Sequence, residues 1–401
     1  MGRRLVFVAL PFAAAGATVA VLALRPTGSQ PLAAERVTPL TVARLVSGWR
    51  APGVPVSVGG FAGAGERVVL RANGRAVASA AAGPLGRYRL RFAPRASGRY
   101  RLLVTTATRR RAAGSLVVRP VVVDAVGDVT FGEEVGPALA AHGGAYPWTF
   151  IAPTLRRADI TVGNLETAVG SAGTAQPKEF TFRGPPSGLQ PMANLAGFDA
   201  LTLANNHSGD FGAEGLLETL RSVRAAGIIP FGAGADEAAA RKPAVLEAGG
   251  LKVAFLGYSD VNPLGFNATA SGPGTAKADT ALIASDVRAA RRHADVVVCF
   301  LHWGVELHPD PDMRQQQIAA ACLSAGAAVV LGAHPHVLGP VSAPGRRSLI
   351  AWSLGNFVFP SAGVTARTGI LQVHLGADGV RGFRLLPVRI AGFQPQPVAA
   401  Q

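Results

Sequence analysis

The chain has 401 residues, of which 49% are hydrophobic and 16% are charged, and its net charge is +15. This composition excludes an intrinsically disordered chain, and the length leaves room for two domains after a targeting segment. Arginine carries nearly all of the positive charge. A GC-rich genome would produce such a bias, but the charge would attract a polyanion in either case. Nucleic acid is not the expected polyanion, because the sequence has no base-reading motif or basic helix.

Residues 5–24 form an apolar stretch without charge, preceded by Arg3 and Arg4 and followed by Arg25. About 20 apolar residues span a bilayer, and cations before such a segment favour an N-terminus that stays inside the cell. We therefore expect residues 1–30 to form a signal anchor and linker, with a cleaved signal peptide as the alternative. The first version predicts a single-pass protein of the cell membrane, and both versions place the bulk of the chain outside the cytoplasm.

Residues 31–119 contain short β-like segments separated by Gly, Pro, Asn or Ser turns. The segments that begin at Tyr88 and Tyr100 alternate apolar residues with arginine, as half-exposed strands do. Roughly six or seven such segments predict an all-β sandwich. The region resembles bacterial immunoglobulin-like modules. It has no cluster of His, Cys or acidic residues, so we interpret it as a spacer or binding module.

Between residues 120 and 395, strand-like runs alternate with helical runs. The expected strands are residues 121–127, 160–164, 200–204, 252–257, 296–301, 328–331 and 349–352, and the expected helices are residues 215–226, 280–293 and 313–325. A shorter β tail follows at residues 370–374 and 383–387. This alternation predicts an α/β domain with sheets buried on both faces. Cys299 and Cys322 lie in apolar segments, and we expect both to be buried free thiols.

Five of the expected strands end in groups that can bind a metal ion. These groups are Asp128, Glu166 after Asn164, Asn206 with His207, His302 with Glu306, and His334 with His336. Open α/β sheets place ligands at the carboxyl ends of their strands, so residues far apart in sequence would meet there. Carboxylate, amide and imidazole groups together suit divalent Mn, Fe or Zn. The alternative is a set of polar turns and structural histidines.

These five strand ends, together with the segment after residues 349–352, form six motifs in the order seen in the CapA family, the poly-γ-glutamate capsule synthesis proteins. The motifs are Gly127-Asp128-x-x-x-Gly132, Asn164-Leu-Glu166, Ala204-Asn-Asn-His-x-x-Asp210, His302-Trp-Gly-x-Glu306, Gly332-Ala-His-Pro-His336 and Ser353-Leu-Gly-Asn-Phe357. The resemblance extends from about Val121 to Pro387. Because CapA-like domains are similar to calcineurin-like metallophosphoesterases, it implies a two-sheet α/β/β/α sandwich.

The resemblance also implies a binuclear metal site. The implied metal ligands are Asp128, Glu166, Asn206, His302, His334 and His336. Asp128 and His336 would bind the first ion, Glu166 would bridge the two ions, and the other three residues would bind the second ion. His207 would be the acid that protonates a leaving group, and Asp210 and Glu306 would orient the histidines.

Two positions depart from the phosphoesterase pattern. Thr130 stands where that pattern has a histidine, and Glu166 stands where aspartate is usual. The first metal site is therefore one imidazole short. This departure weakens an inference of phosphatase activity more than an inference of metal binding.

Three functions are compatible with these observations. The first is an exported, membrane-anchored capsule-biosynthesis protein that hydrolyses or transfers amide bonds of an anionic polymer such as poly-γ-glutamate. The second is an envelope phosphoesterase, and the third is a non-catalytic scaffold or export component for the polymer. Other capsule synthesis proteins would be its protein partners. Arg183, together with Lys178 and Arg367, is expected to bind carboxylates of the substrate.

Overall fold

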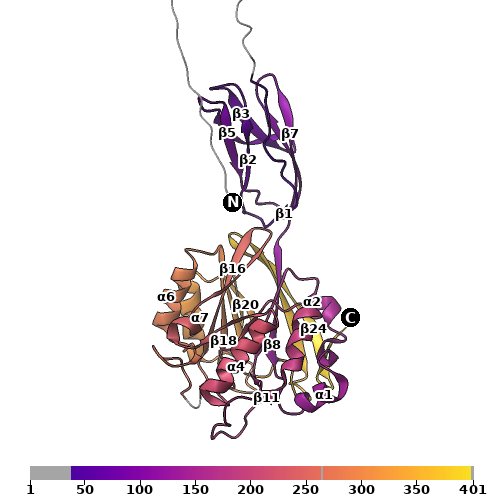
Figure 1. The fold of residues 1–401 in the computed structure, drawn as a ribbon, viewed down its shortest axis with the longest axis vertical. Coiled ribbons are helices and arrows are strands. Elements are labelled where there is room, and N and C mark those ends of the chain that lie inside the picture. The colour runs from indigo at the N-terminus through magenta and orange to yellow at the C-terminus, as the bar shows by residue number, and fades with distance from the viewer. Residues whose placement is uncertain (1–37, 263–264, 399–401) are drawn as a thin grey trace, which may run out of the picture. The chain divides into compact units, whose positions relative to one another are not determined.

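The computed structural model describes residues 38–262 and 265–398 (Figure 1). The apolar stretch expected to anchor the chain, residues 5–24, lies outside these ranges. Among the residues that are described, no helix has the length and apolarity needed to cross a membrane.

Residues 49–118 are built from β-strands in two sheets. The first sheet has the order β1-β7-β6-β3-β4, and β2 pairs with β5 in the second. The bounds are β1 Trp49–Arg50, β2 Val56–Phe61, β3 Arg67–Ala72, β4 Arg75–Ala81, β5 Arg87–Phe92, β6 Gly98–Thr105 and β7 Arg110–Val118. Asn73 and Gly74, with φ of 48° and 83°, form the two-residue turn between β3 and β4. Positive φ at both positions is what such a hairpin turn requires. The six strand-like segments expected here are confirmed as β2 to β7.

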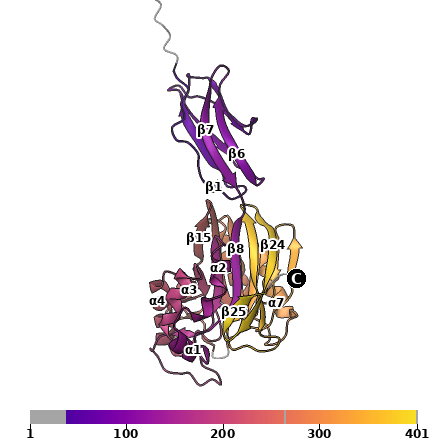
Figure 2. The same ribbon diagram turned by 90° about the vertical axis from the view of Figure 1, so that its right-hand side faces the viewer.

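The first sheet of the α/β region has the order β13-β12-β9-β8-β23-β24-β25, with β22 beside β8. Figure 2 labels β8, β24 and β25 of this sheet. The bounds are β8 Val121–Val129, β9 Ile160–Leu165, β12 Ala200–Thr202, β13 Ile229–Phe231, β22 Asn356–Val358, β23 Arg367–Gly376, β24 Gly379–Ala391 and β25 Gln394–Pro397. The strands from β13 to β8 are parallel, whereas β23, β24 and β25 are antiparallel to their neighbours.

The second sheet has the order β15-β16-β18-β19-β21-β20. The bounds are β15 Ala244–Ala248, β16 Leu251–Ser259, β18 Val296–His302, β19 Val329–Ala333, β20 Val341–Gly345 and β21 Ser348–Ala351. Strands β16, β18, β19 and β21 are parallel, and every residue of β18 and β19 is buried. Two short ribbons pair β10 Ala168–Val169 with β11 Arg183–Gly184 and β14 Ala233–Gly234 with β17 Gly274–Thr275.

Helices cover the outer faces of the two sheets. They are α1 Val135–His142, α2 Ala152–Leu155, α3 Leu189–Asn194, α4 Gly212–Ala225, α5 Glu237–Ala240, α6 Thr280–Ala290 and α7 Met313–Ala325, with 3-10 turns η1 Tyr146–Trp148 and η2 Pro186–Gly188. Leu139 and Met192 pack in the core outside the first sheet, and Ile283 and Ile318 pack outside the second. Helices α6 and α7 therefore lie on one side of the sheets and α1 and α2 on the other (Figure 1).

A central core between the two sheets joins them. Val123 and Leu371 of the first sheet pack with Phe255 and Phe300 of the second. The order helix, sheet, sheet, helix confirms the expected two-sheet α/β/β/α sandwich. The seven expected strands, the three expected helices and the β tail are also present. Cys299 and Cys322 are buried and free, as expected. The immunoglobulin-like class of residues 31–119 and the domain boundaries stay predictions.

Candidate metal centre

Parallel pairing brings the predicted site residues to one edge of the sandwich. Asp128, near the end of β8, is in register with Asn164 at the end of β9. His302, the last residue of β18, is in register with Ala333, which directly precedes His334. The loop after β12, which pairs with β9, carries Asn206 and His207. The carboxyl ends of strands from both sheets therefore meet here, where α/β folds place ligands.

Two groups of side chains at this edge have a geometry that could hold metal ions. One is formed by Asp128, Glu166 and His336, and the other by Glu166, His302 and His334. Within each group the candidate ligand atoms lie within 4.8 Å of one another. Glu166 belongs to both groups, which matches the bridging position expected for it. The two groups bring together residues expected at a first and a second ion, and the division of ligands between two ions stays a prediction.

Individual distances show how tightly these groups are arranged. Oδ2 of Asp128 is 3.4 Å from Nδ1 of His336, and Oε1 of Glu166 is 3.4 Å from Nε2 of His302. Oδ1 of Asn206 is 2.7 Å from the same nitrogen of His302. Asn206 therefore lies beside the second group, where an amide ligand is expected.

Three polar atoms of the cluster lack the hydrogen-bond partners that burial normally demands. Glu166 is fully buried, yet neither of its carboxylate oxygens has a hydrogen-bond partner among the described residues. Nδ1 of His334 is also buried and has no hydrogen-bond partner among the described residues. Leaving a buried polar atom unpaired costs about 1–3 kcal/mol, and more for a charged group. A divalent cation would satisfy these atoms at once, so the residues present fit a metal centre.

The pKa values of the cluster indicate competition for positive charge. Burial, together with the charge of Asp128, raises the pKa of Glu166 well above its ordinary value. Burial lowers the pKa of His302 well below its ordinary value and that of His334 to about 4. Burial also acts to lower the pKa of His336, but Asp128 and Glu166 outweigh it and raise this pKa to about 10. A bound cation would take the place of these protons, because metal binding and proton release are linked.

The backbone is strained at His334 and His336. His334 and His336 have φ of 97° and 58°, a region that non-glycine residues rarely adopt. Such strain is typical of functional sites, where the surrounding structure holds it in place. Gly127 allows the backbone of Gly355 to approach closely, because a Cβ at position 127 would overlap the carbonyl oxygen of Gly355. The amide of Asp128 donates to that same oxygen at 3.0 Å, so the glycine lets the Gly355 turn hold Asp128 in place.

Two asparagines contact candidate ligands directly, and a third asparagine holds one of these two in place. Nδ2 of Asn164 donates to Oδ1 of Asp128 at 2.8 Å, and Asn205 donates to Oδ1 of Asn164 at 2.9 Å. Oδ1 of Asn356 lies 2.7 Å from Nδ1 of His336. All three asparagines lie within the six sequence motifs, and this position was the signal that could have identified them as site residues. Their partners, however, come from other strands.

His207 is held beside the cluster by a hydrogen bond at the edge of its ring and by an aromatic ring stacked on its face. Its Nδ1 is 2.7 Å from Oδ2 of Asp210, so it donates a proton there and leaves Nε2 directed toward Glu166, at 4.0 Å from Oε1. The ring of Phe182 stacks on His207 with 3.7 Å between centroids. Burial lowers the pKa of His207, and Asp210 acts in the opposite direction. Asp210 thus stands where a residue that orients His207 is expected.

Lys178 completes this arrangement. Its Nζ donates to Oδ1 of Asp210 at 2.6 Å and to the carbonyl oxygen of Asn206 at 2.8 Å. The lysine side chain is 10% exposed and the Asp210 side chain is fully buried. Of the three cations expected near substrate, Lys178 is therefore part of the cluster.

The other two predicted cations are placed differently. The guanidinium of Arg183 donates to the carbonyl oxygens of Ser171, Ala172 and Gly173 and lies over the ring of Phe211. Its predicted role in substrate binding would require some of these contacts to change. Arg367 is exposed at the start of β23.

Glu306 and Thr130 also have defined positions. Glu306 is exposed. Together with His334 and His336 it forms a third group of candidate metal ligands. Its role in orienting a histidine stays a prediction. Thr130 is buried, and its hydroxyl accepts from the amide of Gly132 at 3.0 Å. At this position the chain therefore has a turn-stabilising hydroxyl in place of an imidazole.

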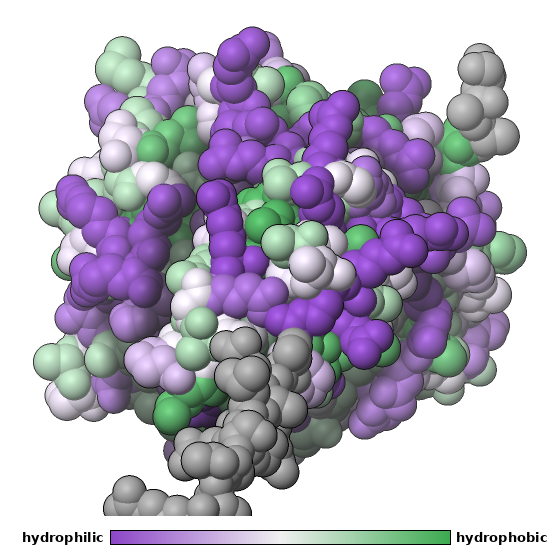
Figure 3. All heavy atoms as spheres, turned by 90° about the horizontal axis from the view of Figure 1, so that it is seen from above, coloured by the Kyte–Doolittle hydropathy of each residue, from purple (hydrophilic) through white to green (hydrophobic). Residues whose placement is uncertain are grey.

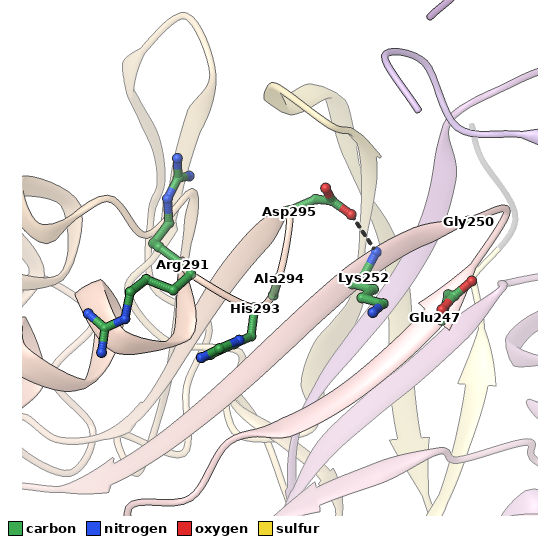
Figure 4. Close-up of a pocket in the computed structure, with 8 residues that line it drawn as sticks. Glu247, Gly250, Lys252, Arg291, His293, Ala294 and Asp295 are labelled. Carbon is green, nitrogen blue, oxygen red and sulfur yellow. Dashed lines mark hydrogen bonds between the residues drawn. The ribbon is translucent and has the colours of Figure 1, made fainter. Parts of the chain in front are cut away.

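A hollow of about 610 Å³ lies away from this cluster (Figure 4). It is next to Lys252 in β16 and to Asp295, which precedes β18, so it is near the opposite ends of the strands. The carboxylate of Asp295 accepts the backbone amide of Lys252 at 2.9 Å. His293 lines this hollow, and none of the residues of the two candidate metal groups lines it.

The fold and this cluster define a two-sheet α/β/β/α protein with a candidate metal centre at the carboxyl ends of its strands. Residues 122–361 match the family described as bacterial capsule synthesis protein PGA_cap, and the chain belongs to this family.

Two relatives extend this match. The chain is 32% identical to the PGA biosynthesis protein CapA of Bacillus subtilis, over 68% of this chain and 72% of the relative. It is 30% identical to the capsule biosynthesis protein CapA of Bacillus anthracis, over 69% of each. Among solved structures, it is similar to the NAD nucleotidase NadN of Haemophilus influenzae, with 14% identity, a TM-score of 0.42 and coverage of 70% of this chain and 60% of that chain. The calcineurin-like phosphoesterase YfkN of Bacillus subtilis gives 13% identity, a TM-score of 0.40 and coverage of 70% and 88%.

Proposed function

We propose that this chain is an exported capsule-biosynthesis protein that hydrolyses or transfers γ-amide bonds of poly-γ-glutamate at a binuclear metal centre. Membership of the capsule synthesis family supports the substrate class. The observation that carries the proposal is Glu166, a fully buried carboxylate that belongs to both candidate metal groups and whose oxygens accept no hydrogen bond from the described residues. An anchor formed by residues 1–30 would hold the protein at the cell membrane.

The proposed centre divides its work among the chain's own residues. Asp128, Glu166 and His336 would hold one divalent ion, and Glu166, His302, His334 and Asn206 would hold the other. Such ions, identified only as Mn, Fe or Zn by the ligand types, would act as Lewis acids that polarise the scissile carbonyl. His207 would move a proton at Nε2, the ring nitrogen directed toward Glu166. Asp210, Lys178 and Phe182 would keep that ring in one tautomer and orientation.

Metal content and turnover of the full chain test the proposal together. The parent should bind two equivalents of Mn or Zn and cleave a γ-linked glutamate oligomer, and His334→Ala/His336→Ala should lose both properties. His207→Ala should keep the metal and lose turnover by about two to four orders of magnitude, as is usual for a general acid or base. Metal retention without turnover of this oligomer would rule out the hydrolytic role and favour a binding component. Turnover of a phosphoester that depends on His207 would instead assign the centre to phosphate substrates.

A further inference from the structure

The positive charge of the chain is concentrated in one region. Residues 39–119 contain fifteen arginines, no lysine, no aspartate and a single glutamate, which gives a net charge of +14. Residues 120–401 contain 20 Lys and Arg against 22 Asp and Glu, a net charge of −2. A genome-wide preference for arginine would not remove the acidic residues from one region alone. The charge is therefore a property of the all-β region.

The single acidic residue of this region is already paired. Glu66 forms an ion pair with Arg109 and accepts the amide of Gly63. It therefore supplies no counter-charge to the other arginines. Like charges on one small domain repel one another, and such a field attracts extended anions.

Strand β5 arranges three of these arginines in a row. Arg87, Arg89 and Arg91 are exposed and alternate with the buried Tyr88 and Leu90. Successive side chains of a strand point to opposite faces, so the three arginines share one face at intervals of about 6.8 Å. We call Arg87, Arg89 and Arg91 the arginine row.

The neighbouring strand leaves the arginine row open. Strand β2 lies beside β5 (Figure 1), with Gly59 and Ser57 opposite Arg89 and Arg91, and Phe61 opposite Arg87 in the register of the pair. The guanidinium of Arg87 lies 5.8 Å from the centre of the Phe61 ring. Within the described ranges, no hydrogen bond or ion pair holds the side chains of Arg89 and Arg91. Hydrophilic side chains also cover much of the face of the molecule shown in Figure 3.

We infer that the arginine row is a binding surface for an extended polycarboxylate chain, and that it holds the polymer on which the metal centre acts. This inference rests on the proposed function. A γ-linked glutamate residue contributes five backbone bonds, against three for an α-linked residue, so its extended repeat is about 6 Å. In the fully extended chain successive carboxylates point to opposite sides, because the repeat contains an odd number of bonds. Rotation about the Cα–Cβ and Cβ–Cγ bonds can turn them to one side, so each arginine can pair with the carboxylate of a successive residue.

Binding of an end-labelled γ-linked glutamate oligomer to the full chain, followed by fluorescence anisotropy, tests this inference. Arg87→Gln/Arg89→Gln/Arg91→Gln should weaken binding about tenfold at low salt, as expected for three exposed ion pairs. Salt should reduce the affinity of the parent more than that of the variant, because exposed pairs are screened. The matched control is Arg99→Gln/Arg101→Gln, which removes exposed charge from β6 of the other sheet.

The outcomes separate this inference from the proposed function. Loss of binding in the triple variant, with little loss in the β6 variant, supports the arginine row. Equal losses in both variants, or no loss in either, overturn it and leave the metal-centre proposal intact. Tighter binding of inorganic polyphosphate through the same arginines overturns the assignment to polycarboxylates. Binding that survives His334→Ala/His336→Ala agrees with the inference, whereas binding that requires these histidines overturns it. Unchanged thermal melting of the triple variant excludes unfolding as the cause.

Discussion

Nζ of Lys178 lies 2.6 Å from Oδ1 of Asp210, while Oδ2 of the same carboxylate lies 2.7 Å from Nδ1 of His207. One buried carboxylate thus links a lysine to the histidine that is proposed to move protons. Phe182 contributes its amide to Oδ2 of Asp210 at 2.6 Å, and its ring covers His207. The loop that carries Lys178 and Phe182 therefore holds His207 in place from outside the strand ends.

Replacing Lys178 should destabilise the protein and reduce its proposed activity. Lys178→Met leaves Asp210 buried without its cation, and breaking such a pair costs roughly 3–5 kcal/mol. Turnover should fall in kcat more than in KM, because the Nζ of Lys178 is engaged by Asp210 and Asn206 and the substitution mainly disturbs the orientation of His207. Denaturant unfolding and steady-state kinetics check the two effects. Lys242→Met, at an exposed lysine, should leave both unchanged, and a stable, fully active Lys178→Met would contradict this role.

Removing the charge of Glu166 should abolish metal-dependent stabilisation. Glu166→Gln keeps the shape of the side chain but removes the carboxylate shared by the two candidate metal groups. The parent should melt at a higher temperature with Mn or Zn than with a chelator, because a ligand that binds the folded state stabilises it. The variant should melt at the same temperature in both conditions. Glu247→Gln should respond like the parent, and a metal-dependent shift retained in Glu166→Gln would argue against this residue as a ligand.

Asp124 should make stability depend on pH. Burial raises the pKa of Asp124 to about 6, although the hydrogen bond from Gln372 and the charge of Arg384 oppose the shift. The folded-state pKa is higher than the ordinary value of 3.8, so this group's contribution is fully present below pH 3.8 and is lost as the pH rises through about 6. Above about pH 6 the ionised carboxylate of Asp124 lowers the free energy of unfolding by on the order of 2–3 kcal/mol.

Urea unfolding between pH 4 and 7 measures this effect. The stability of Asp124→Asn relative to the parent should rise with pH through this window and then level off. Oδ1 of the substituted residue can still accept from Gln372, which donates at 2.9 Å in the parent. Asp310→Asn, at an exposed carboxylate, should show no such rise. A stability difference independent of pH would mean that Asp124 titrates normally.

Adding one methyl group at Gly127 should disrupt the metal centre. In Gly127→Ala the Cβ would overlap the carbonyl oxygen of Gly355, so the chain before Asp128 must move. Metal content should fall, and stability should fall by about 1–3 kcal/mol, as in overpacked cores. Gly382→Ala is the matched control, because a Cβ there meets no atom within 4 Å. Metal analysis and thermal melting of the two variants check the prediction, which fails if both behave like the parent.

Much of the fold was predictable because its signals are local. The buried run of β18 and the periodic apolar residues of α7 are encoded in adjacent residues. Helix α7 also begins at a capping box formed by Asp312 and Gln315 and ends at Gly326 with φ of 106°. The strand-end motifs indicated which residues could bind metal. Carboxylate, amide and imidazole side chains that recur directly after buried strands are typical of a ligand site.

The pairing of side chains within the site was not predictable in the same way. Lys178 and Arg183 are five residues apart and both basic, yet Lys178 contacts Asp210 while Arg183 contacts backbone carbonyl oxygens. Nothing in their immediate sequence distinguishes the two. Which of them reaches the cluster depends on how the segment between β10 and β11 folds against the loop after β12.

The sequence by itself determined the alternation of strands and helices, the residues that can bind metal and the excess of arginine. These features depend on residue type and on spacing along the chain. Only the tertiary structure decided that neither oxygen of Glu166 accepts a hydrogen bond within the described residues, that Asn164 and Asn356 orient Asp128 and His336, and that Lys178 supports His207. The partners in these contacts lie 20 or more residues apart along the chain. They meet only because parallel strands of two packed sheets end at a common edge.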